Sequence, residues 1–157
     1  MRPDWDTYFM QMTDLVASRS SCVRRQVGAV LVEPHTNTII STGYNGTPSG
    51  TPNCNQGGCR RCNGDAPLGA NYGLCRCVHA EENAIALAAR HGARTDGASL
   101  YSTYSPCFTC FRMAVQAGVL VVRYRILTPY PEEEAAEFQD FVASTGVYMK
   151  QFSPRKD

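Results

Sequence analysis

The sequence has almost no excess of charge of either sign. Its 15 lysine and arginine residues stand against 14 aspartate and glutamate residues, which gives a formal net charge of +1. A general nucleic-acid binder carries a clear basic excess, so we expect no polynucleotide partner. A small anionic ligand is compatible with this balance, because it needs only a local positive pocket.

Long apolar runs are also missing. The first residues, MRPDWDTYFMQMTD, place acidic side chains among the apolar ones, which fits neither a signal peptide nor a membrane-spanning helix. We therefore expect a cytoplasmic protein with no membrane partner. The length of 157 residues predicts a single domain, residues 1–157. A chain of this size buries roughly 68–70% of its unfolded surface, which is enough for a core.

Cysteine, in contrast, is abundant. The chain has eight cysteines, and because it shows no export signal we expect them to lie in a reducing compartment. There, such a density points to metal binding or catalysis rather than to disulfides. The spacing of the cysteines has to distinguish between these uses.

The apolar pattern predicts helices that alternate with strands. Apolar side chains at Tyr8, Met12, Leu15 and Val16 favour a first helix over residues 4–20 that packs on the core through this face. The other expected helices cover 79–92, 107–117 and 131–144, and the expected strands cover 27–33, 38–44, 99–104, 120–127 and 147–152. This order predicts an α/β fold, with a sheet of about five strands covered by helices on both faces.

Residues 45–77 show no such pattern. They are rich in Gly, Asn, Pro and Cys, which predicts a loop of over thirty residues. Loops of this length in a compact domain are usually functional or are held by something other than a core.

Two short segments predict a metal site. HAE (residues 79–81) and PCFTC (residues 106–110) each open an expected helix. Cys107 and Cys110, at positions i and i+3, project from one side of their helix and can share one ion. With His79 as third ligand, the fourth position of a tetrahedral zinc ion is left for water, as in catalytic zinc sites. Both helix N-termini favour thiolate over thiol.

Glu81 lies two residues after His79, where it can reach such a water. One carboxylate can take a proton from water and deliver it to a ring nitrogen and later to leaving ammonia. The combination of H-x-E with P-C-x-x-C is the signature of zinc deaminases acting on nucleobases. Two alternatives stay open: Cys107 and Cys110 could be buried small hydrophobic residues with Glu81 as an ordinary acid in the first turn of a helix, or the site could be a purely structural Cys-Cys-His zinc site.

Four segments resemble the deoxycytidylate (dCMP) deaminase family of the cytidine deaminase-like superfamily. They are CVRRQVGAV (22–30), GYNGTP (43–48), HAEENAI (79–85) and SPCFTC (105–110). The resemblance implies a three-layer α/β/α cytidine deaminase-like fold with a mixed sheet. It also implies hydrolysis of dCMP to dUMP and ammonia, in which zinc hydroxide attacks C4 and Glu81 moves the protons. The dUMP would supply thymidylate synthesis.

Other deaminases match less well. Free cytidine deaminases have cysteine in place of His79, and the YNG loop at residues 44–46 favours the dCMP branch over tRNA adenosine deaminases and the riboflavin-pathway deaminase. Two alternatives stay open. One is a deaminase of dCTP or of a modified cytosine nucleotide, and the other is a zinc-stabilised binding module without catalysis.

The resemblance further implies substrate contacts. Asn45 would lie near the sugar and base, and backbone groups around Ala80 and Ser105 would read the pyrimidine edge. A phosphate needs a cation or backbone donors, and Arg24 or Arg25 is the candidate. Taken alone, Asn45 could be a turn residue before Gly46, although the flanking motif favours the binding role. Either arginine could equally be a solvated surface residue.

Members of this branch are often hexamers regulated by deoxynucleoside triphosphates, with dCTP activating, dTTP inhibiting and Mg²⁺ accompanying the triphosphate. The resemblance therefore implies a homo-oligomer with nucleotide regulators. Arg90 matches a position that resembles the regulatory-nucleotide contact. A cation there also offsets the dipole at the helix C-terminus.

Six cysteines remain outside the expected catalytic pair: Cys22, Cys54, Cys59, Cys62, Cys75 and Cys77. The CxxC at 59–62 and the CxC at 75–77 resemble a four-thiolate structural zinc site, which would hold the long loop in place. Some family relatives use cysteines matching Cys22 and Cys54, plus a residue shortly before the catalytic histidine, for a second zinc. One site with spare cysteines, a two-zinc cluster and unliganded buried cysteines all stay open.

Overall fold

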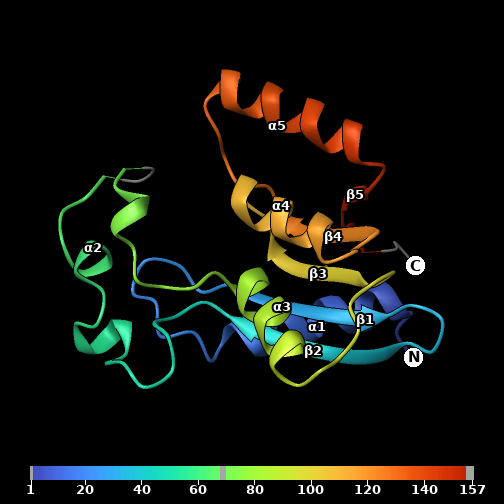
Figure 1. Cartoon of the computed structure of the whole chain (residues 1–157), viewed down its shortest axis with the longest axis horizontal. Coiled ribbons are helices and arrows are strands. Elements are labelled where there is room, and N and C mark those ends of the chain that lie inside the picture. The colour runs from blue at the N-terminus through green and yellow to red at the C-terminus, as the bar shows by residue number, and fades with distance from the viewer. Residues whose placement is uncertain (1, 68–69, 155–157) are drawn as a thin grey trace.

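A mixed sheet forms the centre of the computed structural model, which describes residues 2–67 and 70–154 (Figure 1). Within these residues the sheet has five strands, in the order β2-β1-β3-β4-β5. They are β1 Gly28–Glu33, β2 Thr38–Tyr44, β3 Ser99–Tyr104, β4 Val121–Ile126 and β5 Tyr148–Gln151. β1 pairs antiparallel with β2 and β3, whereas β3, β4 and β5 run parallel. The predicted strands and the mixed sheet are confirmed.

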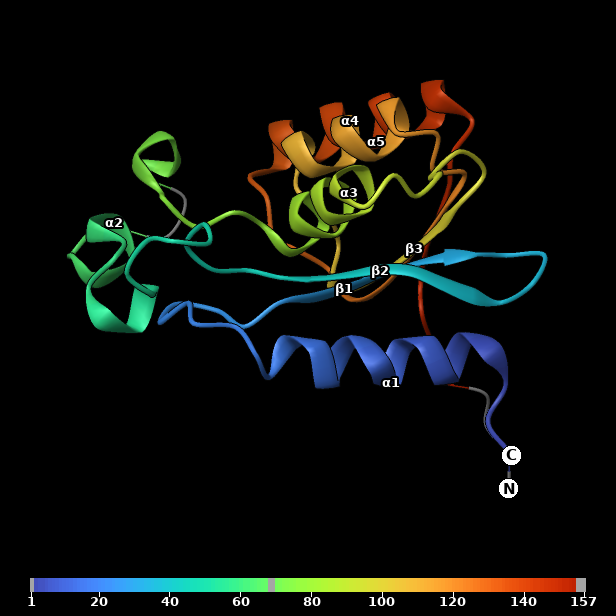
Figure 2. The same cartoon turned by 60° about the horizontal axis from the view of Figure 1, so that its bottom comes forward.

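Helices cover both faces of this sheet. Figure 2 shows α1, Trp5–Ala17, on one face, and α3, α4 and α5 on the other. The bounds of these three helices are Ala80–Arg90, Phe108–Gln116 and Glu132–Thr145. The three-layer α/β/α architecture is therefore confirmed. Throughout the described part of the chain, every helix is too short or too polar to cross a bilayer.

The first helix packs on the core through only part of the predicted face, since Met12 and Val16 are partly buried against it but Tyr8 and Leu15 are exposed. The predicted packing residues were Tyr8, Met12, Leu15 and Val16, and the buried residues are Phe9, Met10, Thr13 and Ala17. Leu15 is 71% and Tyr8 40% exposed, so the predicted face was wrong at these positions. The apolar pattern missed Thr13, which can be buried because its hydroxyl donates to the Met10 carbonyl at 2.7 Å.

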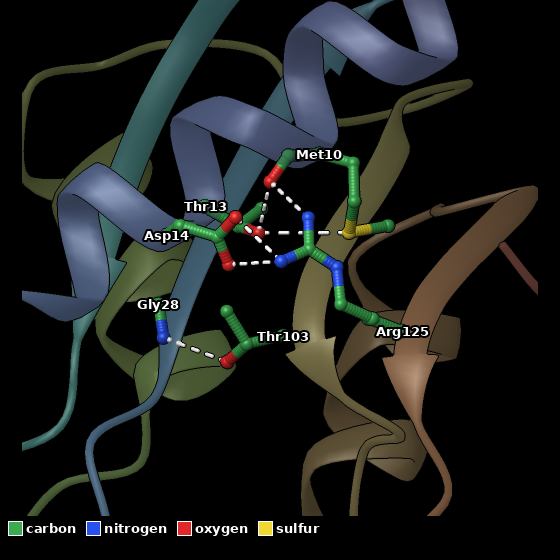
Figure 3. A network of polar contacts seen from close by, with 6 residues as sticks. All are labelled: Met10, Thr13, Asp14, Gly28, Thr103 and Arg125. Carbon is green, nitrogen blue, oxygen red and sulfur yellow. Dashed lines mark hydrogen bonds and ion pairs between the residues drawn. The ribbon is translucent and has the colours of Figure 1, made fainter. Parts of the chain in front are cut away.

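Polar contacts also join α1 to the sheet (Figure 3). Arg125 on β4 pairs with the Asp14 carboxylate and donates to the Met10 carbonyl at 3.2 Å. Within the sheet, the Gly28 N–H donates to Thr103 Oγ1 at 3.1 Å. Because the ion pair is partly exposed, it contributes only about 0.2–1 kcal/mol. Apolar contacts therefore hold α1 in place, and the polar ones set its position.

The segment 45–77 was predicted to be a loop throughout, and this prediction was wrong. It contains two 3₁₀ turns, η1 Cys54–Gln56 and η2 Tyr72–Leu74, and the short helix α2 Arg60–Asn63. Elements of three or four residues are too short to produce a periodic pattern, which explains the wrong prediction. Figure 1 shows that the part of the segment around α2 lies beyond one end of the sheet. Cysteines, rather than an apolar face, are buried there.

Two glycines allow helices to lie directly on the sheet. A Cβ atom at Gly28 would be 2.1 Å from the carbonyl oxygen of Thr13 in α1, and one at Gly43 would be 2.1 Å from that of Ala80 in α3. Gly43 pairs with Ala29, the neighbour of Gly28, in the β1–β2 ladder. The two helices therefore approach opposite faces of the sheet at nearly the same point.

We predict that Gly43→Ala destabilises the protein by about 2–3 kcal/mol, because overpacking a close contact typically costs 1–3 kcal/mol. Thermal unfolding followed by circular dichroism should show a midpoint several degrees below that of the wild type. Gly73→Ala is the matched control, since a Cβ there meets nothing within 4 Å. Equal midpoints for the two variants would contradict the close approach of α3 to β2.

Candidate functional site

The starts of α3 and α4 bring three predicted metal ligands together. His79 is the N-cap of α3, Cys107 is the N-cap of α4, and Cys110 lies in the first turn of α4. His79 Nδ1 is 3.4 Å from Cys107 Sγ and 3.3 Å from Cys110 Sγ, and the two sulfur atoms are 3.5 Å apart. The three side chains form a compact triangle, which we call the ligand triangle.

The donor set of the ligand triangle suits zinc. Zinc binds imidazole nitrogen and cysteine sulfur at about 2.0–2.3 Å, which in a tetrahedron places the donor atoms roughly 3.5–3.8 Å apart. The distances in the triangle lie within a few tenths of an ångström of that range. Three protein donors leave a fourth position for water or substrate, as in catalytic zinc sites.

The three groups also polarise one another. The hydrogen bond with Cys110 is the main cause that lowers the pKa of Cys107 to about 4, and the contact with His79 adds to it. Conversely, the hydrogen bond with Cys107, together with burial, raises the pKa of Cys110. The Cys107 thiolate raises the pKa of His79 to about 9. A metal ion would have to displace the protons that His79 and Cys110 hold.

Glu81 is buried beside the ligand triangle, with 4% of its surface exposed. Its Oε1 accepts a hydrogen bond of 3.1 Å from the hydroxyl of Ser102, a fully buried residue on β3. Burial raises the pKa of Glu81 above the usual value for glutamate, which suits a group that both accepts and releases protons near neutral pH. Sequence reasoning missed Ser102. The available signal was a hydroxyl in the middle of a strand that is otherwise buried.

Two backbone contacts fix the position of His79. The Glu82 carboxylate accepts a hydrogen bond of 3.0 Å from the His79 N–H, and so forms a capping box. Val78, the preceding residue, pairs with Gly46 through N–O contacts of 2.8 and 3.2 Å. Glu82 was not among the predicted site residues, although its place three positions after the N-cap is the sequence signal of a capping box.

Asn45 is buried, and its side chain makes hydrogen bonds to several neighbouring residues. Its Oδ1 accepts hydrogen bonds from the Ser20 hydroxyl at 2.7 Å and from the Val27 N–H at 2.8 Å. Its Nδ2 donates to the Arg25 carbonyl at 2.8 Å. An amide nitrogen has two hydrogens, so one is left for a ligand. The substrate contact of Asn45 stays a prediction.

The other two predicted pyrimidine contacts adjoin the ligand triangle in the chain. Ala80 follows His79 and is fully buried, and Ser105 lies two residues before Cys107. Ser105 is held by Ile126 and Thr128, since its N–H donates to the Ile126 carbonyl and its Oγ accepts from the Thr128 N–H, each at 2.8 Å. Backbone groups near both helix starts are therefore firmly placed.

The predicted cations lie in different surroundings. Arg24 donates to the Cys62 carbonyl at 2.8 Å and to the Gly64 carbonyl. The Arg25 guanidinium lies 4.5 Å from the ring centre of Tyr104, which ends β3 just before the start of α4. Arg90 is exposed at the far end of α3, roughly 16 Å from His79 at 1.5 Å per residue. Of the three arginines, Arg25 is the one whose side chain contacts the segment that leads into the ligand triangle, through Tyr104.

A cavity of about 610 Å³ adjoins α4 and α5. Its lining residues are Phe108, Tyr130, Glu133, Glu134, Ala136, Glu137 and Asp140. Four carboxylates disfavour a phosphate group, so this cavity is not a suitable site for a nucleotide phosphate.

The six remaining cysteines gather in a second place, which we call the thiol cluster. They are Cys22, Cys54, Cys59, Cys62, Cys75 and Cys77. Although burial raises it, the pKa of Cys59 is lowered to about 6 by the N–H groups of Arg76 and Cys62. The segments 59–62 and 75–77 were predicted to act together. In the structure they do lie together, and Cys22 and Cys54, which are more distant in the sequence, lie beside them.

The sequence matches the family model of the cytidine and deoxycytidylate deaminase zinc-binding region over residues 3–125. It is 43% identical over 153 residues to the deoxycytidylate deaminase of Schizosaccharomyces pombe, which covers 98% of this chain and 45% of that protein. Identity to the Saccharomyces cerevisiae deoxycytidylate deaminase is also 43%, over 154 residues, which covers 98% of this chain and 46% of that protein. The chain thus spans less than half the length of these two relatives.

A solved structure is similar over nearly its full length. The dCMP deaminase of the cyanophage S-TIM5, in complex with dCMP and dUMP, is 32% identical and superposes with a TM-score of 0.74. The alignment covers 97% of this chain and 99% of that one. Fold, motif spacing and the match to residues 3–125 agree. The chain therefore belongs to the cytidine and deoxycytidylate deaminase family.

Proposed function

We propose that the chain is a zinc-dependent deaminase that converts dCMP and water to dUMP and ammonia. The observation that carries the proposal is the buried Glu81 carboxyl, held by Ser102 next to the ligand triangle. A structural zinc site has no need for a buried proton carrier beside an open coordination position. The names of the two yeast relatives and the dCMP and dUMP in the phage relative support this choice of substrate.

A zinc ion in the ligand triangle would lower the pKa of a bound water to about 7 and so supply a nucleophile at neutral pH. Glu81 takes a proton from the attacking water and delivers it to the ring nitrogen next to C4. It then moves the second proton to the exocyclic amine, so that the new C4–O bond is kept and the C4–N bond breaks. Each delivery returns the carboxylate to its starting form, so one residue can carry both protons.

The surroundings of the ligand triangle support a placement of the nucleotide. Arg25, beside Tyr104, is the better candidate for the phosphate, because Arg24 already binds two carbonyls near α2. The free amide hydrogen of Asn45 is available to the sugar or base. Backbone groups around Ala80 and Ser105 would then meet the pyrimidine edge.

We also propose that the protein is a cytoplasmic homo-oligomer, with six copies as the arrangement common in the family, and that its dUMP supplies thymidylate synthesis. Activation by dCTP and inhibition by dTTP, each with Mg²⁺, are part of this proposal. The support is the position of Arg90, which is exposed and at the opposite end of α3 from His79. A nucleotide bound there would not compete with the substrate for space.

The proposed substrate predicts the outcome of an ammonia-release assay. With dCMP, dCTP, CMP and cytidine offered separately at equal concentration, release should be fastest from dCMP. Added dCTP should raise the rate with dCMP, and added dTTP should lower it. Faster release from dCTP would favour the triphosphate as substrate, and no release from any of the four would favour a binding module.

Glu81→Gln should lower kcat by about 10²–10⁴-fold, the range typical for loss of a general acid–base group. Its zinc content should equal that of the wild type, because the ligand triangle is untouched. The assay is steady-state kinetics together with metal analysis of the same sample. Glu133→Gln, an exposed acid on α5, is the control for loss of one negative charge. Full activity of the Glu81 variant would exclude its proposed role.

Ser102→Ala should lower kcat about 10–100-fold, because a hydrogen bond to a charged group is worth about 1.5–3 kcal/mol. The hydroxyl positions Glu81 and has no proposed contact with the substrate, so KM should stay within about twofold. Ser99→Ala tests the loss of another buried hydroxyl on the same strand, and it should leave kcat unchanged. If KM and kcat of the Ser102 variant both match the wild type, the hydroxyl does not position Glu81.

A further inference from the structure

The thiol cluster contains more sulfur donors than one metal ion can use. Cys62 lies at its centre, with its Sγ 3.9 Å from that of Cys22, 3.8 Å from that of Cys75 and 4.0 Å from that of Cys77. Cys59 Sγ is 3.9 Å from Cys75 Sγ. Zinc–sulfur bonds of about 2.3 Å in a tetrahedron place sulfur atoms roughly 3.8 Å apart. The spacing in the cluster is therefore that of zinc-bound thiolates.

Two groups of four among these six cysteines are compact enough for each to hold one metal ion. One comprises Cys22, Cys54, Cys62 and Cys77, and the other comprises Cys59, Cys62, Cys75 and Cys77. In each group all four Sγ atoms lie within 4.8 Å of one another. Cys62 and Cys77 belong to both groups, so the two tetrahedra share an edge.

We propose that the thiol cluster binds two zinc ions, with Cys62 and Cys77 bridging them. Four terminal thiolates fill one coordination position each and two bridging thiolates fill two each, which supplies the eight positions of two tetrahedral ions. This proposal does not depend on the deaminase activity, and it concerns ions in addition to the one expected in the ligand triangle.

The surroundings favour two ions over one. Each half of the cluster has its own nitrogen group beside a terminal sulfur. The Arg76 N–H donates to Cys59 Sγ at 3.3 Å, and Asn63 Nδ2 lies 4.0 Å from Cys54 Sγ. Asn63 Nδ2 also donates to the carbonyls of Cys54 and Cys59, at 2.8 and 2.9 Å, and so ties the two halves together. With a single ion, one of these halves would keep two sulfurs in metal-binding geometry without a metal.

Charge does not oppose the second ion. The two positive charges of that ion are balanced by the two additional thiolates that it recruits, so the net charge of the cluster does not change. Arginine side chains also enclose it. Arg24 binds the Cys62 carbonyl, Arg61 binds the Ala70 carbonyl at 3.0 and 3.1 Å, and Arg76 binds the Gly58 carbonyl at 3.4 Å.

The number of sulfurs also selects the metal. Four thiolates in a tetrahedron suit either zinc or iron–sulfur clusters. Iron–sulfur clusters use inorganic sulfide as the bridge and take four cysteines. A set of six cysteines in which two are shared therefore fits zinc bridged by thiolates.

The metal content of the protein tests the proposal. Native mass spectrometry should give about three zinc ions per wild-type chain, and about two in the triple variant His79→Ala/Cys107→Ala/Cys110→Ala, which keeps the thiol cluster intact. Two ions per wild-type chain, or one in the folded triple variant, would overturn the proposal. Visible absorption of an iron–sulfur cluster in the purified protein would also overturn it.

The bridge itself can be observed without any change in the cluster. After replacement of zinc by cadmium-113, the cluster should give two NMR signals in the tetrathiolate range, split by coupling between the two ions through the shared sulfurs. A single tetrathiolate signal, or two signals without mutual coupling, would exclude the bridge.

Matched variants distinguish the halves. Cys22→Ser removes a terminal ligand of one half and Cys59→Ser removes one of the other. Each should lower the zinc content of the cluster by about one ion or weaken retention against a chelator at least tenfold. If only one of the two variants loses metal, a single four-cysteine site explains the cluster and the proposal is wrong.

Discussion

The close approach of two helix N-termini at one edge of the sheet is the constraint on which the candidate site depends. α3 begins at His79 and α4 begins at Cys107, and the ligand triangle exists only where these starts meet. α3 reaches this position because Gly43 lets its backbone lie against β2. Both helix dipoles then present their positive ends to the thiolates, which stabilises the charged form that a metal requires. Packing and metal chemistry thus depend on the same two chain segments.

A second consequence concerns the chain that leads into His79. The described residues of the segment 45–77 bury cysteines rather than an apolar core, so polar contacts, together with the metal ions that we propose for the thiol cluster, would have to order them. Cys77 is only two residues from His79, and Val78 between them is paired with Gly46. A short, paired stretch of backbone therefore links the thiol cluster to the ligand triangle, so a shift of Cys77 would also move His79. Since metal binding contributes directly to folding free energy, the proposed metal ions in the cluster would also help to hold His79 in place.

Glu81, the proposed proton carrier, illustrates how the fold changes the chemistry of an ordinary residue. A glutamate in the first turn of an exposed helix would be fully ionised at neutral pH. In this fold the sheet covers Glu81, and burial raises its pKa. Ser102 donates a hydrogen bond that favours the charged form and opposes part of this effect. The balance between a covering strand and one hydroxyl sets how readily the carboxyl exchanges protons.

The sequence by itself determined the strands, the helix starts and which three residues form the ligand triangle. These features depend on periodicity, capping and short spacings, which act within about ten residues. The tertiary structure alone decided which face of α1 is buried, that Ser102 holds Glu81, and that Cys22 and Cys54 join the CxxC and CxC segments. It also decided the different surroundings of two neighbouring arginines: Arg25 lies beside Tyr104, whereas Arg24 binds the cysteine-rich segment. Such contacts join residues that are distant in the chain, and local spacing carries no information about which distant segments pack together.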